Sequence, residues 1–163
     1  MVPDLGWRLQ IYERDRPVKV SIVLVAEDDV SLRVSITLLL QSLGCEVHAC
    51  SDGHSAALWM KEWMRTADIG KRVCILTDLE MSPGDGLELL SELKALERQW
   101  TAKWGTDHTP WVTIVTSARE GGERLAIQAG ADLFLKKPFV PSALIECVPK
   151  AFVRLNSTQI VKN

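Results

Sequence analysis

The sequence VCILTDLEMSPGDG, residues 73–86, decides the fold. It begins with four apolar residues and ends in a run rich in Pro, Gly and Asp. A short apolar run bounded by polar and turn-forming residues predicts a buried β-strand. Asp78 follows closely, where the strand enters a loop. Because open α/β sheets bind ligands at the carboxyl ends of their parallel strands, we place the candidate chemistry at Asp78.

Strand and helix patterns alternate along the rest of the chain. Apolar strands are predicted at residues 21–26, 46–50, 73–76, 111–115 and 132–135. Helical spacing of apolar residues follows each of them, at residues 30–43, 54–66, 87–96, 123–129 and 142–155. The spacing of Trp100 and Trp104 is consistent with a longer third helix. Five strand–helix repeats predict an α/β fold with a parallel sheet covered by helices on both faces.

The repeats divide the chain into one domain and two short flanking segments. We predict an N-terminal extension at residues 1–19, with one helical turn around residues 7–12, and the domain at residues 20–155. Residues 156–163 are predicted to form a C-terminal tail. A length of 163 residues is sufficient for a single domain with a substantial core.

Composition excludes several classes of function. The net charge is −2, so nothing favours nucleic acid or an anionic membrane as the main partner. No apolar run approaches the roughly 20 residues of a membrane helix, and the start of the chain lacks a signal-peptide core. The four cysteines have no CxxC spacing and are predicted to be mostly buried apolar residues. We expect a cytoplasmic protein.

Polar residues that carry chemistry follow four of the predicted strands. They are Glu27, Asp28 and Asp29 after the first strand, Asp78 after the third, Thr116 and Ser117 after the fourth, and Lys136 and Lys137 after the fifth. In a parallel sheet these strand ends lie on one edge. Clustered carboxylates repel one another, and Mg²⁺ is a hard cation that binds through carboxylates and accepts phosphate oxygens. A carboxylate nucleophile, a metal and a lysine predict a phosphoaspartate site.

Each of these residues alone has an ordinary structural interpretation. A strand-end Asp is often a helix cap, and the acidic run after the first strand also suits a helix N-terminus. Lys137 alone would be a solvated surface lysine, and Thr116 alone a hydroxyl that satisfies the backbone. Their joint placement on neighbouring strand ends favours the functional interpretation.

The motifs IVLVAEDD (22–29), ILTDLEM (75–81), IVTSA (114–118) and QAGADLFLKKPF (128–139) together resemble the receiver domain of two-component response regulators. The resemblance covers about residues 20–155. It implies a doubly wound, flavodoxin-like sheet with strand order 2-1-3-4-5, the order that is general for this fold family.

The resemblance also implies roles for individual residues at a magnesium site. Asp78 is similar to the phospho-accepting aspartate of the family. Asp28 would bind Mg²⁺ directly, Glu27 would bind it through water, and the backbone carbonyl of Glu80 would be a further ligand.

Three more residues resemble the family's switch. Thr116 corresponds to the hydroxyl that turns towards the phosphoryl group, and Phe134 to the aromatic side chain that reports its state. Lys137 rather than Lys136 matches the lysine before the family's proline, so a cis Lys137–Pro138 bond is expected.

The family implies a function without a classical enzymatic activity. A histidine kinase or a histidine phosphotransfer protein would phosphorylate Asp78, and the chain would lose the group by autodephosphorylation. Output would pass through the face of the fourth helix, fifth strand and fifth helix to a downstream protein or a fused effector. A homodimer is a further option.

Some residues depart from the family pattern. Met81 is followed by Ser82, with Pro83 one place late and Gly84 where methionine is common. The connections at residues 66–71 and 98–110 are long, which makes them candidates for a private contact surface. The pairs Trp59/Trp63 and Trp100/Trp104 are predicted to pack the second and third helices together, or to form a partner-binding patch.

The sequence leaves two alternative classes of function. A receiver-like interaction module would act without phosphorylation, although every expected acidic, hydroxyl and lysine position is filled. A Mg²⁺-dependent aspartyl phosphatase of the haloacid dehalogenase type would need a second Asp two places after Asp78, where this chain has Glu80.

Overall fold

The computed structural model describes residues 12–13, 16–17, 22–67, 71–105 and 109–157. Its centre is a parallel sheet of five strands, in the spatial order β4-β3-β5-β6-β7. The strands are β3 (Ile22–Ala26), β4 (Glu46–Cys50), β5 (Val73–Asp78), β6 (Trp111–Ser117) and β7 (Leu133–Lys136). Numbered within this sheet, the order is 2-1-3-4-5, which confirms the predicted doubly wound fold.

Each strand is followed by a helix. The helices are α1 (Val30–Ser42), α2 (Gly53–Thr66), α3 (Gly86–Trp104), α4 (Gly122–Gln128) and α5 (Pro141–Ser157). The side chains of Asp29, Asp52 and Asp85 cap the first three of these helices by accepting a backbone N–H three residues on. Such caps satisfy donors that the first turn of a helix leaves without a partner.

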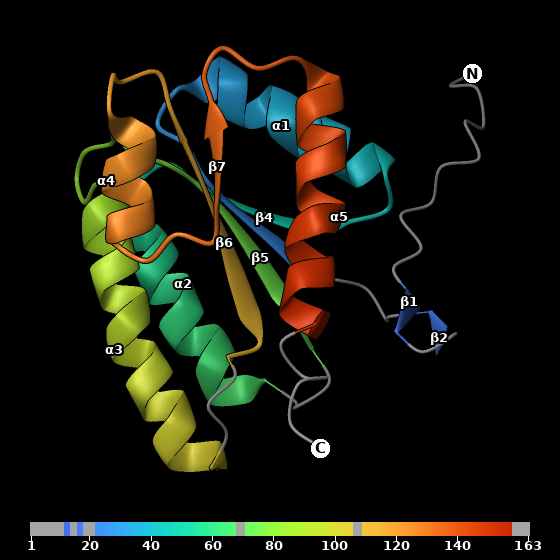
Figure 1. Cartoon of the computed structure of the whole chain (residues 1–163), viewed down its shortest axis with the longest axis vertical. Coiled ribbons are helices and arrows are strands. Elements are labelled where there is room, and N and C mark those ends of the chain that lie inside the picture. Colours follow the sequence, from blue (N-terminus) through green and yellow to red (C-terminus); the bar gives the residue numbers. More distant parts are fainter. Residues whose placement is uncertain (1–11, 14–15, 18–21, 68–70, 106–108, 158–163) are drawn as a thin grey trace.

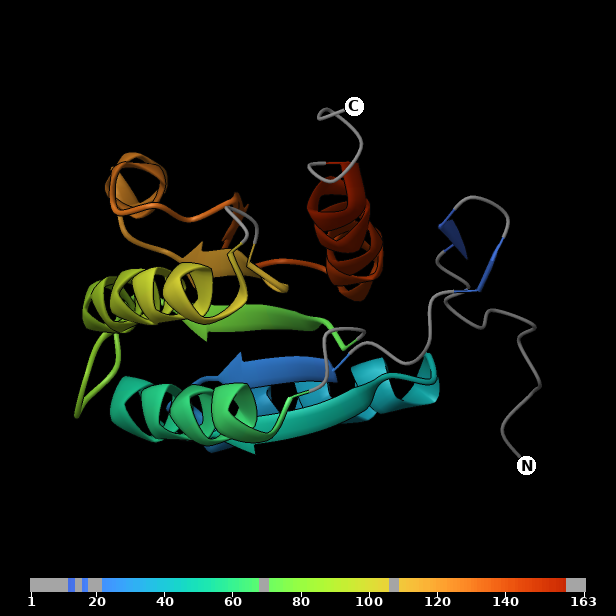
Figure 2. The same cartoon turned by 90° about the horizontal axis from the view of Figure 1, so that it is seen from below.

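The helices cover both faces of the sheet. Figure 1 shows α2, α3 and α4 on one side of the strands and α1 and α5 on the other, and Figure 2 shows α2 and α3 lying side by side. Two apolar cores result, one under α2, α3 and α4 and the other under α1 and α5. The three central strands are buried along their whole length, because a sheet covered on both faces exposes neither set of side chains.

The tryptophans fill the space between α2 and α3. Trp63 of α2 stacks on Trp100 of α3 at 6.4 Å between ring centroids, and Trp111 at the start of β6 meets Trp100 edge-on at 6.2 Å. Trp59 continues the stack to His48 on the edge strand β4. These contacts confirm that the pairs pack the two helices together, and they give His48 a structural role.

Element boundaries differ from the predictions by a few residues. β6 continues to Ser117 and β7 begins at Leu133, while α3 extends through Trp104 as the tryptophan spacing indicated. The predicted helical turn at residues 7–12 is wrong at Tyr12, since Tyr12–Glu13 pairs antiparallel with Arg16–Pro17 as β1 and β2. The rest of that turn lies outside the described residues. None of the helices in the described part is both long and apolar enough to span a membrane.

Strand register places the carboxyl ends of the strands at one edge. Asp78 on β5 lies opposite Thr116 on β6, and Ala26, the residue before Glu27, lies opposite Thr77. Ser117 lies opposite Lys136 on β7. The parallel register therefore brings the predicted polar residues together, although they are far apart in the sequence.

Candidate functional site

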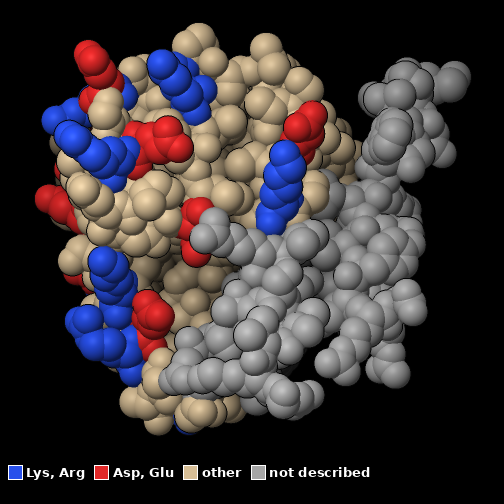
Figure 3. Space-filling view, in the orientation of Figure 1, with Lys and Arg blue, Asp and Glu red and all other residues tan. Residues whose placement is uncertain are grey.

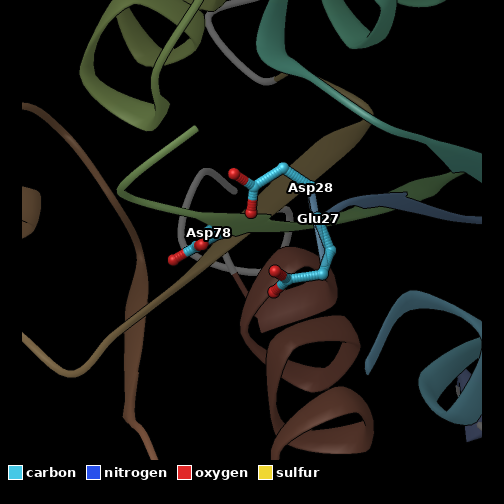
Figure 4. A group of neighbouring side chains, drawn as sticks. All are labelled: Glu27, Asp28 and Asp78. Carbon is cyan, nitrogen blue, oxygen red and sulfur yellow. The ribbon is translucent and has the colours of Figure 1, made fainter. Parts of the chain in front are cut away.

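The acidic residues lie at the ends of β3 and β5. Glu27, Asp28 and Asp78 each offer a carboxylate oxygen, and these oxygens lie within 4.8 Å of one another. Figure 4 shows the three carboxyl groups gathered beside the strand ends. Glu27 and Asp78 are buried, whereas Asp28 is exposed. The cluster thus combines two desolvated carboxylates with one that faces the solvent.

An arginine holds the acidic segment after β3. The Arg33 guanidinium of α1 donates to the carbonyl oxygen of Glu27 at 2.6 Å and to that of Asp28 at 3.2 Å. This role for Arg33 was not predicted, because a helical arginine is ordinarily a solvated residue. The contact fixes the backbone of the acidic pair relative to α1.

Lys137 neutralises part of the acidic cluster. Its Nζ lies 2.8 Å from Glu27 Oε2 and 3.1 Å from Asp78 Oδ2. The neighbouring Lys136 is exposed at the end of β7. The structure therefore brings Lys137, and not Lys136, into the cluster, and the Lys137–Pro138 bond is cis as expected.

The pKa values of the three paired groups are displaced by burial and by one another. Burial raises the pKa of Glu27, and the Asp78 carboxylate adds to this effect, while Lys137 opposes it. Burial likewise raises the pKa of Asp78 against the opposing pull of Lys137. Burial alone would lower the pKa of Lys137, but the two carboxylates outweigh it and raise the pKa. The carboxylates thus resist ionisation in the absence of a further cation.

One oxygen of Asp78 is suited to a metal. Asp78 Oδ1 is buried and has no hydrogen-bond partner in the part of the chain that the structure describes. A buried carboxylate oxygen without a partner is costly, and a hard cation would satisfy it. The surrounding donors are all oxygens, which is the ligand set of Mg²⁺. The residues present therefore fit a magnesium ion, with Glu27, Asp28 and Asp78 as the candidate ligands.

Thr116 and Phe134 lie near this edge without contacting the carboxylates. Thr116 is buried, and its hydroxyl donates to the Thr77 carbonyl oxygen over a long 3.5 Å. Phe134 is half-buried on β7 and packs against the core beneath α4. The Thr116 hydroxyl is thus weakly held in this arrangement.

The loop after Asp78 is hydrogen-bonded to the start of α2. The Gly53 N–H donates to the Gly84 carbonyl oxygen at 2.9 Å. A Cβ added at Gly53 would lie 2.3 Å from that oxygen, so only glycine allows this approach. The departure from the family pattern at residues 82–84 therefore coincides with a close loop–loop contact.

Glu80 has a side-chain contact that sequence reasoning missed. The Ser117 hydroxyl lies 3.0 Å from both carboxylate oxygens of Glu80 and donates to them. The prediction concerned only the backbone carbonyl of Glu80. The sequence carries no signal for the side-chain contact, because it joins the loop after β5 to the last residue of β6, and these approach each other only in the folded sheet.

Comparisons with known proteins agree with this geometry. Residues 23–149 match the family model described as the response regulator receiver domain. The chain is 26% identical over 135 residues to the peroxide stress-activated histidine kinase mak2 of Schizosaccharomyces pombe. This match covers 83% of this chain and 6% of the kinase. It is 29% identical over 154 residues to nodulation protein W of Bradyrhizobium diazoefficiens, covering 94% of this chain and 60% of that protein.

A solved structure shares the fold. The receiver domain of Ssk1 from Saccharomyces cerevisiae, crystallised with the histidine phosphotransfer protein Ypd1, matches with a TM-score of 0.69 and 20% identity. The match covers 83% of this chain and 91% of the matched one. The matched regions span only 6% and 60% of the lengths of these two curated relatives.

Proposed function

This chain belongs to the response regulator receiver domain family, and we propose from that premise that it accepts a phosphoryl group on Asp78 in a two-component or phosphorelay pathway. The observation that carries the proposal is the arrangement around Asp78. Its buried carboxylate contacts Lys137 at 3.1 Å and lies beside Glu27 and Asp28, and one of its oxygens has no partner among the described residues.

The proposed step is a transfer to the Asp78 carboxylate. A carboxylate oxygen attacks the phosphorus of a phosphohistidine, an oxygen–phosphorus bond forms, and the phosphorus–nitrogen bond breaks. Its electron pair remains on the departing imidazole. Lys137 is placed to hold a phosphoryl oxygen, and Mg²⁺ bound by the acidic residues would supply positive charge to the same group. Thr116 would supply a hydroxyl after a small displacement, since its present hydrogen bond is long.

The proposed binding surface for the phosphoryl-donor protein lies on α1. Val30, Val34 and Leu38 follow one another at helical spacing, and all three are exposed. This stripe begins one residue after Asp29, next to the acidic cluster. Exposed apolar side chains in a continuous strip favour a protein contact, so we propose that the donor protein docks there.

The proposed binding surface for the downstream partner lies on α4, β7 and α5. Ile127 and Ile145 are exposed on the two helices, and the first three residues of β7 are only half-buried. Figure 3 shows few charged side chains over the upper middle of this face. We propose that a downstream protein, a fused effector or a second copy of the chain binds here when the state of the site changes.

The test is the intact mass of the protein after incubation with Mg²⁺ and acetyl phosphate. We expect the wild type to gain one phosphoryl group and Asp78→Asn to gain none. Asp85→Asn is a matched control in the same loop, because Asn still caps α3. An unmodified wild type with the donor in excess, together with no binding of beryllofluoride, would leave a phosphorylation-independent interaction module as the function.

A further inference from the structure

Ser117 joins three loops at the edge of the sheet. Its hydroxyl donates to the Glu80 carboxylate in the loop after β5 and accepts the Arg119 N–H at 2.9 Å in the turn after β6. Its carbonyl oxygen accepts the Lys137 N–H at 2.9 Å from the loop after β7. Ser117 is fully buried, so these contacts are made without competition from solvent at the serine.

The contact with Glu80 depends on charge. A carboxylate is a stronger acceptor for a hydroxyl than a neutral group. Glu80 lies two residues after Asp78, and its negative charge helps to raise the pKa of the Asp78 carboxyl. The two carboxylates therefore interact electrostatically, and further negative charge on residue 78 would repel the exposed Glu80 side chain.

We propose that Glu80 and Ser117 form a charge-sensitive latch between the acceptor loop and the turn after β6, closed in the unphosphorylated protein and opened by the negative charge that a phosphoryl group adds to Asp78. The inference rests on the proposed function. Glu80 is then a positioning residue, because it acts on the site through Ser117.

The latch restrains the residue that has to move. Thr116 directly precedes Ser117, and its own carbonyl oxygen accepts the Leu79 N–H at 2.9 Å. Any shift of Thr116 towards Asp78 displaces Ser117 as well, and the closed latch opposes that shift.

Opening the latch also affects the start of α4. Gly122, the first residue of α4, packs closely on Ser117, since a Cβ added there would lie 3.0 Å from the serine hydroxyl. The Arg119 amide loses its acceptor when the serine hydroxyl turns away. The latch thus links the charge on Asp78 to the turn that leads into the proposed output face.

The Arg119 amide provides the measurement. Its hydrogen exchange is followed by NMR in Mg²⁺ with and without beryllofluoride, which stands in for the phosphoryl group. Fluorine NMR of the same sample shows whether beryllofluoride is bound. The variants are Glu80→Gln, which keeps an acceptor and loses the charge, and Ser117→Ala, which removes the hydroxyl. Glu120→Gln is the control, because it removes another exposed charge, from the turn itself.

Binding of beryllofluoride is expected to speed exchange at Arg119 by about fivefold in the wild type and in Glu120→Gln, the effect of losing one ordinary hydrogen bond. Ser117→Ala should exchange about fivefold faster without any ligand and change little when it binds. Glu80→Gln should respond less than half as strongly as the wild type, because its side chain is not repelled.

Two results would overturn the latch while leaving the phosphoacceptor intact. One is an unchanged Arg119 exchange rate in wild type that shows a bound fluorine signal. The other is an equal response in Glu80→Gln and the wild type. A missing fluorine signal would instead overturn the proposed function, and the latch with it.

Discussion

The two ends of the sheet are held together in opposite ways. At the amino ends of the strands, Trp63 and Trp100 are buried against Trp111 in the apolar core between α2 and α3. At the carboxyl ends, Glu27 and Asp78 are buried as a pair of acids with raised pKa values. The first end gains free energy from apolar burial, whereas the second loses free energy by desolvating charge. The apolar packing and the proposed phosphoacceptor site therefore lie at different ends of the same strands.

The largest test of this comparison is Trp100→Ala. Trp100 is almost fully buried and contacts three other tryptophans, so its loss should lower the free energy of unfolding by about 3–5 kcal/mol. Urea unfolding followed by far-ultraviolet circular dichroism measures the change. Trp104→Ala is the control, since Trp104 is 37% exposed and should cost about 1 kcal/mol or less. Equal losses in the two variants would contradict the aromatic end as the main source of stability.

A smaller change with the opposite sign is expected for Asp78→Asn. Removing one buried charge should raise the free energy of unfolding without metal by about 1 kcal/mol, the usual gain when a functional residue is replaced. Mg²⁺ should reverse the order, because a ligand at 100 times its Kd stabilises the wild type by roughly 2.7 kcal/mol. Thermal unfolding with and without Mg²⁺ gives both values. A variant that is less stable than metal-free wild type would show that the ion pair with Lys137 outweighs the desolvation of Asp78.

The smallest effect concerns pH. Glu27 and Asp78 have raised pKa values in the folded state, so between the ordinary values of 4.5 and 3.8 and the folded ones the native protein binds more protons than the unfolded chain. The free energy of unfolding contributed by these groups should fall as pH rises through that window, by less than about 1.4 kcal/mol per pH unit for one proton.

The difference between wild type and Asp78→Asn contains the Asp78 part of this slope, together with the change at Glu27, whose pKa the Asp78 carboxylate raises. Groups such as Asp52, whose lowered pKa adds stability that is lost as pH falls, contribute equally to both proteins and cancel. Urea unfolding of metal-free samples at a series of pH values measures the difference. Parallel curves for the two proteins would show that Asp78 titrates alike in the folded and unfolded states.

Much of the fold was predictable because its signals are local. Continuous apolar strands and helical spacing gave the alternation, and the polar residues at the strand ends gave the cluster around Asp78. The strand order came from the family resemblance, since pattern alone does not specify which strands pair. Tyr12 was mispredicted because a two-residue strand is too short to show a period.

The parts of the site that were missed depend on side-chain contacts that form only in the folded chain. The Arg33 guanidinium reaches the carbonyl groups of the acidic pair from one turn into α1, and the Glu80 carboxylate meets Ser117 across two loops. Neither contact follows from residue type or spacing. The Arg33 contact depends on how the chain turns from β3 into α1. The Glu80 contact depends on the parallel register of β5 and β6, which brings Ser117 to the loop after Asp78.

The stacked tryptophans also determine which structural changes tryptophan fluorescence can detect in this protein. Rings 5.5–6.5 Å apart exchange excitation readily, so emission from Trp59, Trp63, Trp100 and Trp104 will behave as that of one shared fluorophore. That fluorophore lies at the far end of the strands from Asp78. Emission from these four tryptophans should therefore follow the opening of the α2–α3 core and change little when an ion enters the acidic cluster. A dye or a tryptophan introduced on the loop after β7 would be needed to watch the site itself.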